Sequence, residues 1–556
     1  METGRLVWWI DLPARYTPTK LLQRLRRAGC LAGPRLLTRY ECVFLDTQDG
    51  RLAKQGVRLS VCAARRGAIC HLAGADGESE RPFPGEITFQ SLSPDSPGVP
   101  PQARDLASGR LILPLVRLRV SAWTTRLRSP SGSVLALRAE RFTAAPPGES
   151  WSKAAGPFGL LTIRWLEGDQ EADADLGAQL RDHLELPAAR GDACRLALLA
   201  LGIPEPGAPV PAHLRVRPDD LLPLATRKIV GQQTLKMRAN VKGALEGLDP
   251  EYLHDLRVAT RRLRSALRLL AEVLGPRRCN FLRAELGWIG QILGTVRDLD
   301  VFIRNLRTQA RRLAEAGGIA TLLAEELERQ REPTRRALCA ALASRRFAYL
   351  MSRLEAVAAS PAPHRPRGRH NVPVIEVAPV LIQRAQKRVL KLGRAIGRDS
   401  PAADLHRLRI LFKRLRYTCE FFREAFVDPA SGKDPLAEYV QAMVRFQDCL
   451  GEHQDAVVAM ARIQELARDM VRRGVLAPER LMDLGAIVQV QREIARKRRG
   501  RLRKLWARFD KPSMRKRVEV VRAKAAGALK CADLSGTNGR EAKGGAPSGT
   551  SRLERE

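Results

Sequence analysis

The sequence has few aromatic residues, no closely paired cysteines and no long apolar run. Phe, Trp and Tyr make up 5% of its 556 residues, and its ten cysteines are scattered. No two cysteines have the two-residue gap of zinc and redox motifs, so we expect reduced thiols in a cytoplasmic protein. No stretch approaches the roughly 18 uninterrupted apolar residues of a membrane helix, and the apolar run at 6–10 is too short for a secretory signal. We therefore expect neither a membrane span nor a disulfide framework.

Positive charge is what the sequence has in excess. Lys and Arg total 96 against 60 Asp and Glu, which gives a net charge of +36 and an isoelectric point near 10.8. Self-repulsion of this size is best tolerated when a polyanion neutralises it, which favours a nucleic acid, an anionic lipid or a phosphate polymer as partner. With 44% apolar residues the chain can still bury large cores, and at about 150 residues per domain its length predicts several domains.

The first part of the chain differs from the rest in its sequence pattern. Residues 1–203 contain short extended runs broken by Gly, Pro and Ser, which predicts a β-rich domain. The Pro-rich segment 204–218 is typical of a linker. Residues 219–510 show the 3.6-residue periodicity of helices. The sequence therefore predicts a β-rich domain followed by a helical domain.

The helical part itself consists of two stretches. These are predicted at 219–358 and 374–510, with a basic, flexible connection at 359–373. The remainder, 511–556, is rich in Gly, Ser and Lys, and we predict that it is a disordered tail.

The two helical stretches repeat the same motifs. His, Arg, a basic residue, a further Arg and another Arg fall at offsets 0, 3, 7, 8 and 10 from His254 and again from His406. Downstream, Leu-Gly-x-x-Arg-Asp at 293–298 matches Leu-Gly-x-x-Gln-Asp at 450–455. Two matches in the same order indicate internal duplication, which predicts two similar helical bundles related by a pseudo-two-fold axis.

On a helix, the spacing of each motif places its basic side chains on one face. One basic stripe comprises His254, Arg257, Arg261, Arg264 and Arg268; the other comprises His406, Arg409, Lys413 and Arg416. Beside them run mostly apolar stripes that we expect to dock into the core: Leu253, Leu256, Thr260, Leu263, Leu267 and Leu270 in the first copy, and Leu405, Leu408, Phe412, Leu415, Cys419 and Phe422 in the second. Each basic stripe is thus predicted to lie on an anchored helix.

A solvated charged face is the ordinary interpretation of such a stripe. Against it, no acid occurs between Asp255 and Glu272 or between Asp404 and Glu420, although like charges at i,i+4 destabilise a helix. Arginine, whose planar fork grips phosphate oxygens, also predominates. We therefore favour polyanion binding by both stripes.

The repeated histidines and aspartates allow more than one interpretation. Each histidine is either a half-buried structural residue or a phosphate contact. Asp298 and Asp455 either orient the basic groups or pair with arginines of a neighbouring helix. A metal site from His254, His406, Asp298 and Asp455 is a weaker alternative, because neither motif has an i,i+4 His pair or cysteine ligands. We predict no metal and no cofactor.

The doubled His-x-x-Arg cluster with Leu-Gly-x-x-Arg-Asp closely resembles the CHAD family, the conserved histidine α-helical domain, over residues 219–509. The resemblance implies an all-α fold of two pseudo-symmetric four-helix bundles whose basic helices line a groove or pore that binds inorganic polyphosphate. It implies polyphosphate contacts at ten residues: His254, Arg257, Arg261, Arg262, Arg264, His406, Arg409, Lys413, Arg414 and Arg416. Arg297, Asp298 and Asp455 would support them, and Gln454 departs from the pattern by replacing the arginine seen at 297.

The β-rich part resembles a CYTH, or triphosphate tunnel, domain. The likeness rests on residues 40–59, where Asp-Thr-x-x-x-x-Leu begins at Asp46. The resemblance implies an antiparallel β tunnel, so the fold class as a whole is α+β multidomain. The family's metal-binding Glu-x-Glu-x-Lys strand is replaced by Val-Trp-Trp-Ile-Asp at 7–11, and its Leu-Arg-x-Arg by Leu-Ser-Val-Cys at 59–62. Its late Glu-x-Glu strand has no counterpart near 161–165. We therefore expect a degenerate tunnel without hydrolytic activity, a pseudoenzyme.

These inferences combine into a non-catalytic, cytoplasmic polyphosphate-binding protein, with polyphosphate granules as one location. Nucleic-acid binding by the same stripes is the first alternative, disfavoured because single-strand binders interleave aromatic residues and only Tyr252 and Tyr417 flank the stripes as tyrosines. Metal-dependent triphosphatase activity involving Asp11 or Glu140 is the second. The oligomeric state and the preferred chain length of the ligand do not follow from the sequence.

Overall fold

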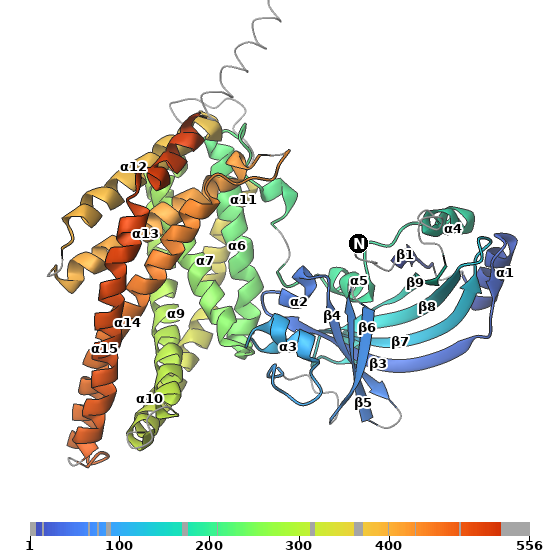
Figure 1. Cartoon of the computed structure of the whole chain (residues 1–556), viewed down its shortest axis with the longest axis horizontal. Helices are drawn as coiled ribbons and strands as arrows, with labels where there is room; N and C mark the ends of the chain where they lie inside the picture. Colours follow the sequence, from blue (N-terminus) through green and yellow to red (C-terminus); the bar gives the residue numbers. More distant parts are fainter. Residues whose placement is uncertain are drawn as a thin grey trace, which may run out of the picture. The chain divides into compact units, whose positions relative to one another are not determined.

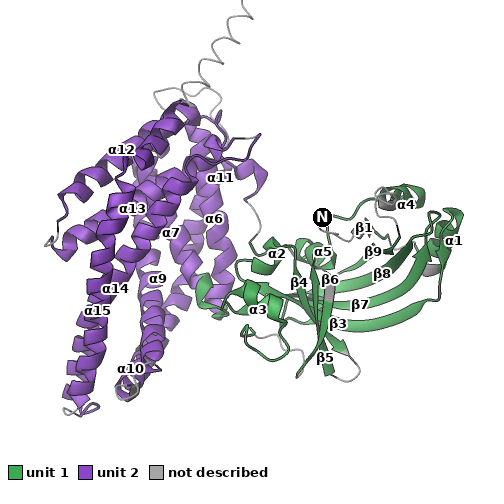
Figure 2. Cartoon of the chain, in the orientation of Figure 1, with its two compact units in different colours: residues 1–209, 246–252 green, residues 210–245, 253–556 purple. Residues whose placement is uncertain are grey.

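The computed structural model describes residues 7–13, 16–64, 67–74, 77–84, 91–168, 176–207, 210–311, 317–360, 371–397, 400–428, 430–477 and 480–523. The chain divides into two compact units (Figure 2). Unit 1 comprises residues 1–209 with 246–252, and unit 2 comprises 210–245 with 253–556. The boundary at 209/210 falls inside the linker predicted at 204–218.

Unit 1 is built on one antiparallel sheet (Figure 1). Its strands are β1 (Val7–Asp11), β2 (Leu31–Ala32), β3 (Leu36–Thr47), β4 (Arg58–Ala64), β5 (Gly67–Gly74), β6 (Gly77–Phe83), β7 (Ile112–Arg128), β8 (Val134–Ala145) and β9 (Ala155–Glu167). The order across the sheet is β1-β9-β8-β7-β3-β4-β5-β6, and the short β2 pairs with β7. Its helices are α1 (Pro18–Arg27), α2 (Arg51–Lys54), α3 (Pro101–Ala107), α4 (Leu176–Leu184), α5 (Ala193–Ala200) and the 3-10 turn η1 (Trp151–Lys153).

Alternating side chains give the sheet two apolar faces. On β3, Val43 and Leu45 pack with α2 and α3, whereas Cys42 packs with α5. On β7, Trp123 and Leu127 pack with α1 and α4. Because successive residues of a strand point to opposite faces, helices cover both sides of this sheet.

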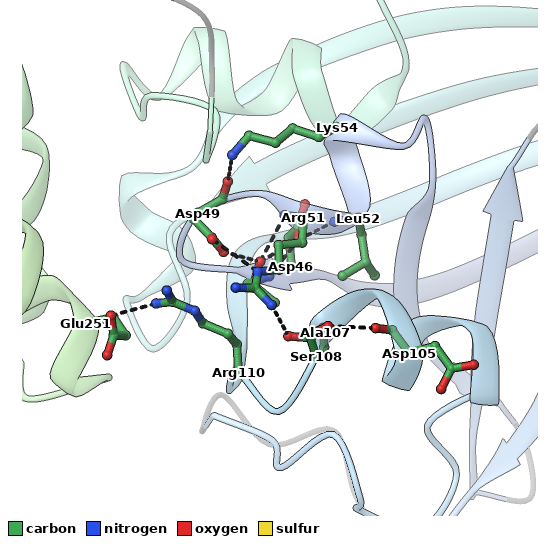
Figure 3. Close-up of polar contacts among 11 residues, drawn as sticks. Asp46, Asp49, Arg51, Leu52, Lys54, Asp105, Ala107, Ser108, Arg110 and Glu251 are labelled. Atoms are coloured by element: carbon green, nitrogen blue, oxygen red, sulfur yellow. Dashed lines mark hydrogen bonds and ion pairs between the residues drawn. The ribbon is translucent and has the colours of Figure 1, made fainter. Parts of the chain in front are cut away.

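The Asp-Thr motif at residue 46 organises the turn from β3 into α2 (Figure 3). The Asp46 carboxylate is 2% exposed and accepts backbone N–H bonds from Thr47, Leu52 and Ala53 at 2.6, 3.0 and 2.9 Å. Burial raises the pKa of this carboxyl, while the backbone hydrogen bonds lower it. Gly50 in this turn has a positive φ of 66°, and a Cβ there would lie 2.0 Å from the Pro206 carbonyl oxygen. In unit 1 this motif therefore has a structural function.

Unit 2 is helical. Its first part contains η2 (Ala212–Leu214), α6 (Leu222–Glu246), α7 (Pro250–Leu269), α8 (Ala271–Leu274), α9 (Pro276–Ala310), α10 (Gly317–Leu342) and α11 (Arg345–Ala359). Its second part contains α12 (Val374–Ala395), α13 (Ala402–Phe422), η3 (Arg423–Phe426), α14 (Ala437–Arg472) and α15 (Leu481–Phe509). The predicted class, an antiparallel β domain followed by an all-α domain, is thereby confirmed.

Equivalent motifs lie on equivalent helices of the two halves. The basic motif lies on α7 and on α13, and the Leu-Gly motif lies on α9 and on α14. All residues of the two predicted apolar stripes are buried, from Leu253 to Leu270 and from Leu405 to Phe422. The halves also share cores: one cluster combines α9 and α10 with α14 and α15, through Leu299, Ile319 and Ile463 among others. The pseudo-two-fold relation between the halves stays a prediction.

Two connecting segments differ from the sequence-based expectation. The predicted linker 204–218 is packed in its second half, where Val216 is 2% exposed and the Leu214 carbonyl accepts a 2.8 Å bond from the Gln232 side chain. The predicted flexible connection 359–373 is fixed at its end, because the Val372 carbonyl accepts the Leu222 N–H at 3.0 Å. Residues 361–370 of that connection lie outside the described residues.

The predicted disordered tail also begins later than expected. Residues 512–523 are helical, and Val518 and Val521 are 3% and 0% exposed in the core that contains Phe509. The prediction from residue 511 onward was wrong here, because the composition of the Gly- and Ser-rich remainder hid two apolar residues at i,i+3. Residues 524–556 lie outside the described part of the chain.

Candidate functional site

The basic stripes of α7 and α13 meet in unit 2. Arg261 on α7 donates a 2.9 Å hydrogen bond from Nε to the Tyr417 hydroxyl on α13. Arg262 on α7 forms an ion pair with Glu420 on α13. The predicted site therefore draws on both repeats.

A cationic cluster forms along this junction, comprising Arg257, Arg261, Arg409, Lys413 and Arg416. Lys413 is half-buried, and its pKa is lowered to about 7, first by desolvation and then by repulsion from the four arginines. Burial also lowers the pKa of Arg257, with Arg261 and Arg409 adding to the shift. The side chains of the cluster thus lie close enough to destabilise one another's charge.

Carboxylates offset only part of this charge. Asp298, with its side chain 61% exposed, lies 3.3 Å from Arg257 Nη2. Glu420 lies 3.5 Å from Arg416 Nε and also pairs with Arg262. Asp455 faces Arg409 and Lys413, and its pKa is raised first by partial desolvation, with Asp298 adding to the rise. Counting Arg262, six cations thus face four carboxylates within the described residues: Asp298, Glu420, Asp455 and also Asp255, which acts on Arg262.

Buried donors in this cluster have no hydrogen-bond partner within the described residues. These are the Nε atoms of Arg262 and Arg409, while Arg416 Nε has only the long 3.5 Å contact with Glu420. A buried N–H donor without an acceptor costs about 1–3 kcal/mol, more for a charged group. An incoming anion would supply the missing acceptors.

The repeated glycines lie under the arginines. A Cβ on Gly451 of α14 would lie 3.3 Å from Arg409 Nη2, and one on Gly294 of α9 would lie 3.6 Å from Arg257 Nε. The Leu-Gly motif of each repeat therefore lets a guanidinium rest against a helix backbone. The repeat is visible in the sequence. The role of its glycine is not, because it depends on the contact of α9 with α7 and of α14 with α13.

The other predicted residues have different settings. His254 is half-buried and His406 is exposed near the start of α13. Arg264 is exposed beside Gly287, whereas Arg414 lies with Arg268 and Arg388, which lower its pKa together with burial. Arg297 is 6% exposed and adds to the repulsion on Arg257. The predicted set therefore separates into the cationic cluster and residues around it.

Sequence reasoning missed three contributors to the site. Tyr417 was noted only as a flanking aromatic, yet it is 1% exposed, and Arg262 and Arg416 lie 5.5 and 5.3 Å from its ring centroid. Glu420 was noted only as the end of the acid-free run, yet it forms ion pairs with Arg262 of the first repeat and Arg416 of the second. Lys236 on α6 is near enough to Arg262 for its pKa to fall, chiefly through desolvation and then through that repulsion.

In unit 1, the two residues named for residual triphosphatase activity, Asp11 and Glu140, lie in different environments. Glu140 is 8% exposed and accepts hydrogen bonds from Tyr40 at 3.0 Å and from Arg138 at 2.7 Å. Asp11 is exposed, and its backbone N–H bonds the Pro187 carbonyl. Within the described residues, no group of three or more His, Cys, Asp or Glu side chains is arranged to hold a metal ion. Nor does any described helix combine the length and apolarity of a membrane span.

The described part of the chain thus combines an antiparallel sheet domain with a helical domain in which the basic helices α7 and α13 contact each other. Residues 228–464 match the family model of the CHAD domain, so this part of the chain belongs to that family, as the repeated motifs predicted. The preceding domain has the antiparallel sheet that the CYTH resemblance of residues 40–59 implied.

Relatives match both parts of the chain. The uncharacterized protein Rv2226 of Mycobacterium tuberculosis is 26% identical over 496 residues, which covers 85% of this chain and 90% of that protein. The CHAD domain from the plant Ricinus communis is 27% identical, with a TM-score of 0.39, over 57% of this chain and 96% of that domain. HpAC1 from Hippeastrum, described as having a dominant triphosphatase activity, is 15% identical with a TM-score of 0.22, over 36% of this chain and 96% of that protein.

Proposed function

We propose that the protein binds inorganic polyphosphate through the cationic cluster of α7 and α13, without catalysing its turnover. The observation that carries this proposal is the meeting of basic side chains from both repeats, where Arg261 of α7 contacts Tyr417 of α13 and four arginines surround the half-buried Lys413. Their mutual repulsion destabilises the folded chain, and a bound polyanion would relieve it. Association with polyphosphate granules in the cytoplasm is part of the proposal.

Phosphate is the anion that suits these side chains. Arginine forks bind phosphate oxygens in pairs, and the buried Nε atoms of Arg262 and Arg409 have no hydrogen-bond acceptor within the described residues. A polyphosphate chain presents such oxygens at every unit, so a single ligand can contact arginines from both repeats.

The binding test compares two variants that remove the same charge. The first, R257A/R261A/R409A/K413A, removes four cations of the cluster. The control, R238A/R329A/R407A/R472A, removes four exposed arginines that pair with Glu355, Glu326, Asp404 and Asp469. We expect the cluster variant to lose at least tenfold in affinity for polyphosphate of defined length in a fluorescence titration, and the control to lose much less.

Circular dichroism separates binding from folding in this test. The cluster variant should keep its helix content, because the substitutions relieve repulsion. Equal loss of affinity in both variants would overturn the proposal, since nonspecific charge would then explain binding. An unfolded cluster variant would show that these side chains are structural, and the proposal would fail.

Nucleic acid is the second candidate ligand, and one observation favours it. A pocket of about 350 Å³ between α9 and α11 is lined by Arg277, Arg278, Arg353, Phe281 and Tyr349 among others. Its two rings lie edge to face at 5.9 Å and are exposed, as stacking on bases requires. By contrast, Tyr417 in the cluster is buried beneath guanidinium groups and offers no free ring face.

Competition distinguishes the two ligands. At fixed salt and equal phosphate concentration, we expect single-stranded RNA not to displace polyphosphate, and F281A/Y349A to leave polyphosphate affinity unchanged. Displacement by RNA, with loss of binding in F281A/Y349A, would favour nucleic acid instead.

For unit 1 we propose a non-catalytic role. The Glu140 carboxylate is already bound by Tyr40 and Arg138, which supports a structural function for it. The corresponding assay is phosphate release from tripolyphosphate with magnesium or manganese. We expect none; release that is abolished by D11N or E140Q would overturn this assignment.

A further inference from the structure

Two cysteines of unit 1 lie directly opposite each other on neighbouring strands. Cys42 of β3 pairs in register with Cys62 of β4 in the antiparallel ladder. Directly opposite residues of such a ladder have Cα atoms about 4.5–5.5 Å apart, inside the roughly 4.4–6.8 Å span that a disulfide bridges. Both thiols are free. The register therefore places the two residues within the Cα separation that a disulfide bridges.

A histidine and a carboxylate lie beside the pair on the next two strands. His71 of β5 pairs in register with Ser60, two residues before Cys62, and with Glu80 of β6. His71 Nδ1 lies 3.0 Å from Glu80 Oε1. This contact orients the imidazole ring.

The two thiols differ in access and in acidity. Cys42 is 3% exposed, whereas Cys62 is half-buried. The pKa of the Cys62 thiol is lowered, first by a hydrogen bond from Cys42 and then by His71 and Ser60. The pKa of Cys42 is raised, because it keeps its proton in that hydrogen bond and is desolvated. Cys62 is therefore the nucleophile and Cys42 the resolving thiol.

The other described cysteines of the sheet lack these features. Cys70 lies on the opposite face of β5, where desolvation raises its thiol pKa to about 12. Cys30 is 1% exposed, and burial raises its pKa. Burial also raises the pKa of Cys194 on α5. Within the described part of unit 1, Cys62 thus combines access, a histidine neighbour and a second thiol in bonding register.

We propose that Cys62 and Cys42 form a peroxide-reactive dithiol that closes to a cross-strand disulfide. The Cys62 thiolate attacks one oxygen of a hydroperoxide, the O–O bond breaks, and the leaving oxygen takes a proton to depart as water or an alcohol. The resulting sulfenic acid of Cys62 is attacked by the Cys42 sulfur, which loses its proton as the S–S bond forms and a second water leaves. Two thiols are oxidised and one hydroperoxide is reduced, without a metal or cofactor.

The test uses the reduced full-length chain and hydrogen peroxide. We expect peptide mapping by mass spectrometry to find a Cys42–Cys62 link. In C42S, a dimedone adduct should accumulate on Cys62, and in C62S neither product should form. Cys339 of α10, also half-buried, is the internal control and should be labelled at least tenfold more slowly. Labelling of Cys62 no faster than Cys339, or a different cysteine partner for Cys62, would overturn the proposal.

A pH profile tests His71 as the positioning residue. The groups facing the pair are Tyr40 of β3, His71 of β5, Glu80 of β6, Arg138 and Glu140 of β8, and Cys194 of the covering α5. We expect the midpoint of Cys62 alkylation by iodoacetamide to move to higher pH in H71Q and by a smaller amount in E80Q. S79A, on the neighbouring position of β6, should leave the midpoint unchanged. An unchanged midpoint in a folded H71Q protein would contradict the assigned role of His71.

Discussion

At the scale of single residues, Lys413 links stability to binding. Its pKa of about 7 in the folded chain lies below the usual 10.5, so the unfolded chain binds more protons between those values. The charged Lys413 amine therefore destabilises the folded chain most below pH 7. This destabilisation decreases as the pH rises toward 10.5. A polyanion favours the protonated amine, so binding is expected to strengthen as the pH falls through 7.

We therefore predict opposite effects of K413M on stability and on binding. At pH 6 the variant should unfold at higher denaturant concentration, with a gain on the order of 1 kcal/mol after solvent screening, and this gain should shrink toward pH 10. The parent protein should bind polyphosphate more tightly at pH 6 than at pH 8, by at most about tenfold per pH unit. In K413M this increase in affinity should be absent. K504M, at an exposed lysine of α15, is the control for both measurements. A pH-independent difference between K413M and the parent would contradict this assignment.

Residue-level prediction from the sequence succeeded where periodicity alone decides the outcome. The 3- and 4-residue spacing placed Leu256, Leu263 and Phe412 in the core and Arg257 and Arg409 beside it. It did not place Glu420 or Tyr417, because their roles depend on α13 lying against α7. Contacts between elements far apart in sequence are not encoded in the periodicity of either one.

At the scale of elements, close approaches between helices depend on small residues. On α12, a Cβ at Gly393 would lie 1.9 Å from Trp506 Cη2 of α15, so the indole rests on the helix backbone. We predict that G393A destabilises the protein by about 1–3 kcal/mol in urea unfolding, because the rigid ring must move out of a packed core. G485A, at an exposed position of α15 with open space around it, should be neutral or stabilising by up to about 1 kcal/mol. Equal effects of both substitutions would contradict this packing.

Elements were predicted unevenly along the chain. The long amphipathic helices were evident from their sequence pattern, whereas the short extended runs of residues 1–203 indicated only a β-rich domain. Short strands of mixed polarity such as β5 and β6 could not be placed, because they take their structure from cross-strand partners. The helix at 512–523 was missed because its two core residues, Val518 and Val521, lie in a segment dominated by charge.

At the scale of the whole molecule, the net charge of +36 predicts a strong dependence of binding on salt. The logarithm of the polyphosphate affinity should fall linearly with the logarithm of the salt concentration, because bound counterions are released. In R257A/R261A/R409A/K413A the slope should be shallower by roughly 3, at about 0.7 per lost contact. Isothermal titration at several NaCl concentrations measures both slopes. The same slope in both proteins would mean that the ligand binds elsewhere.

The junction of α7 and α13 has a consequence for how the protein is maintained in a cell. In the ligand-free chain, crowded guanidinium groups and a desolvated amine work against folding, and a bound polyanion removes that penalty. A ligand that binds only the folded chain would then stabilise it and raise its melting temperature by mass action. If the ligand is polyphosphate as proposed, the ligand-free chain is the form more open to proteolysis.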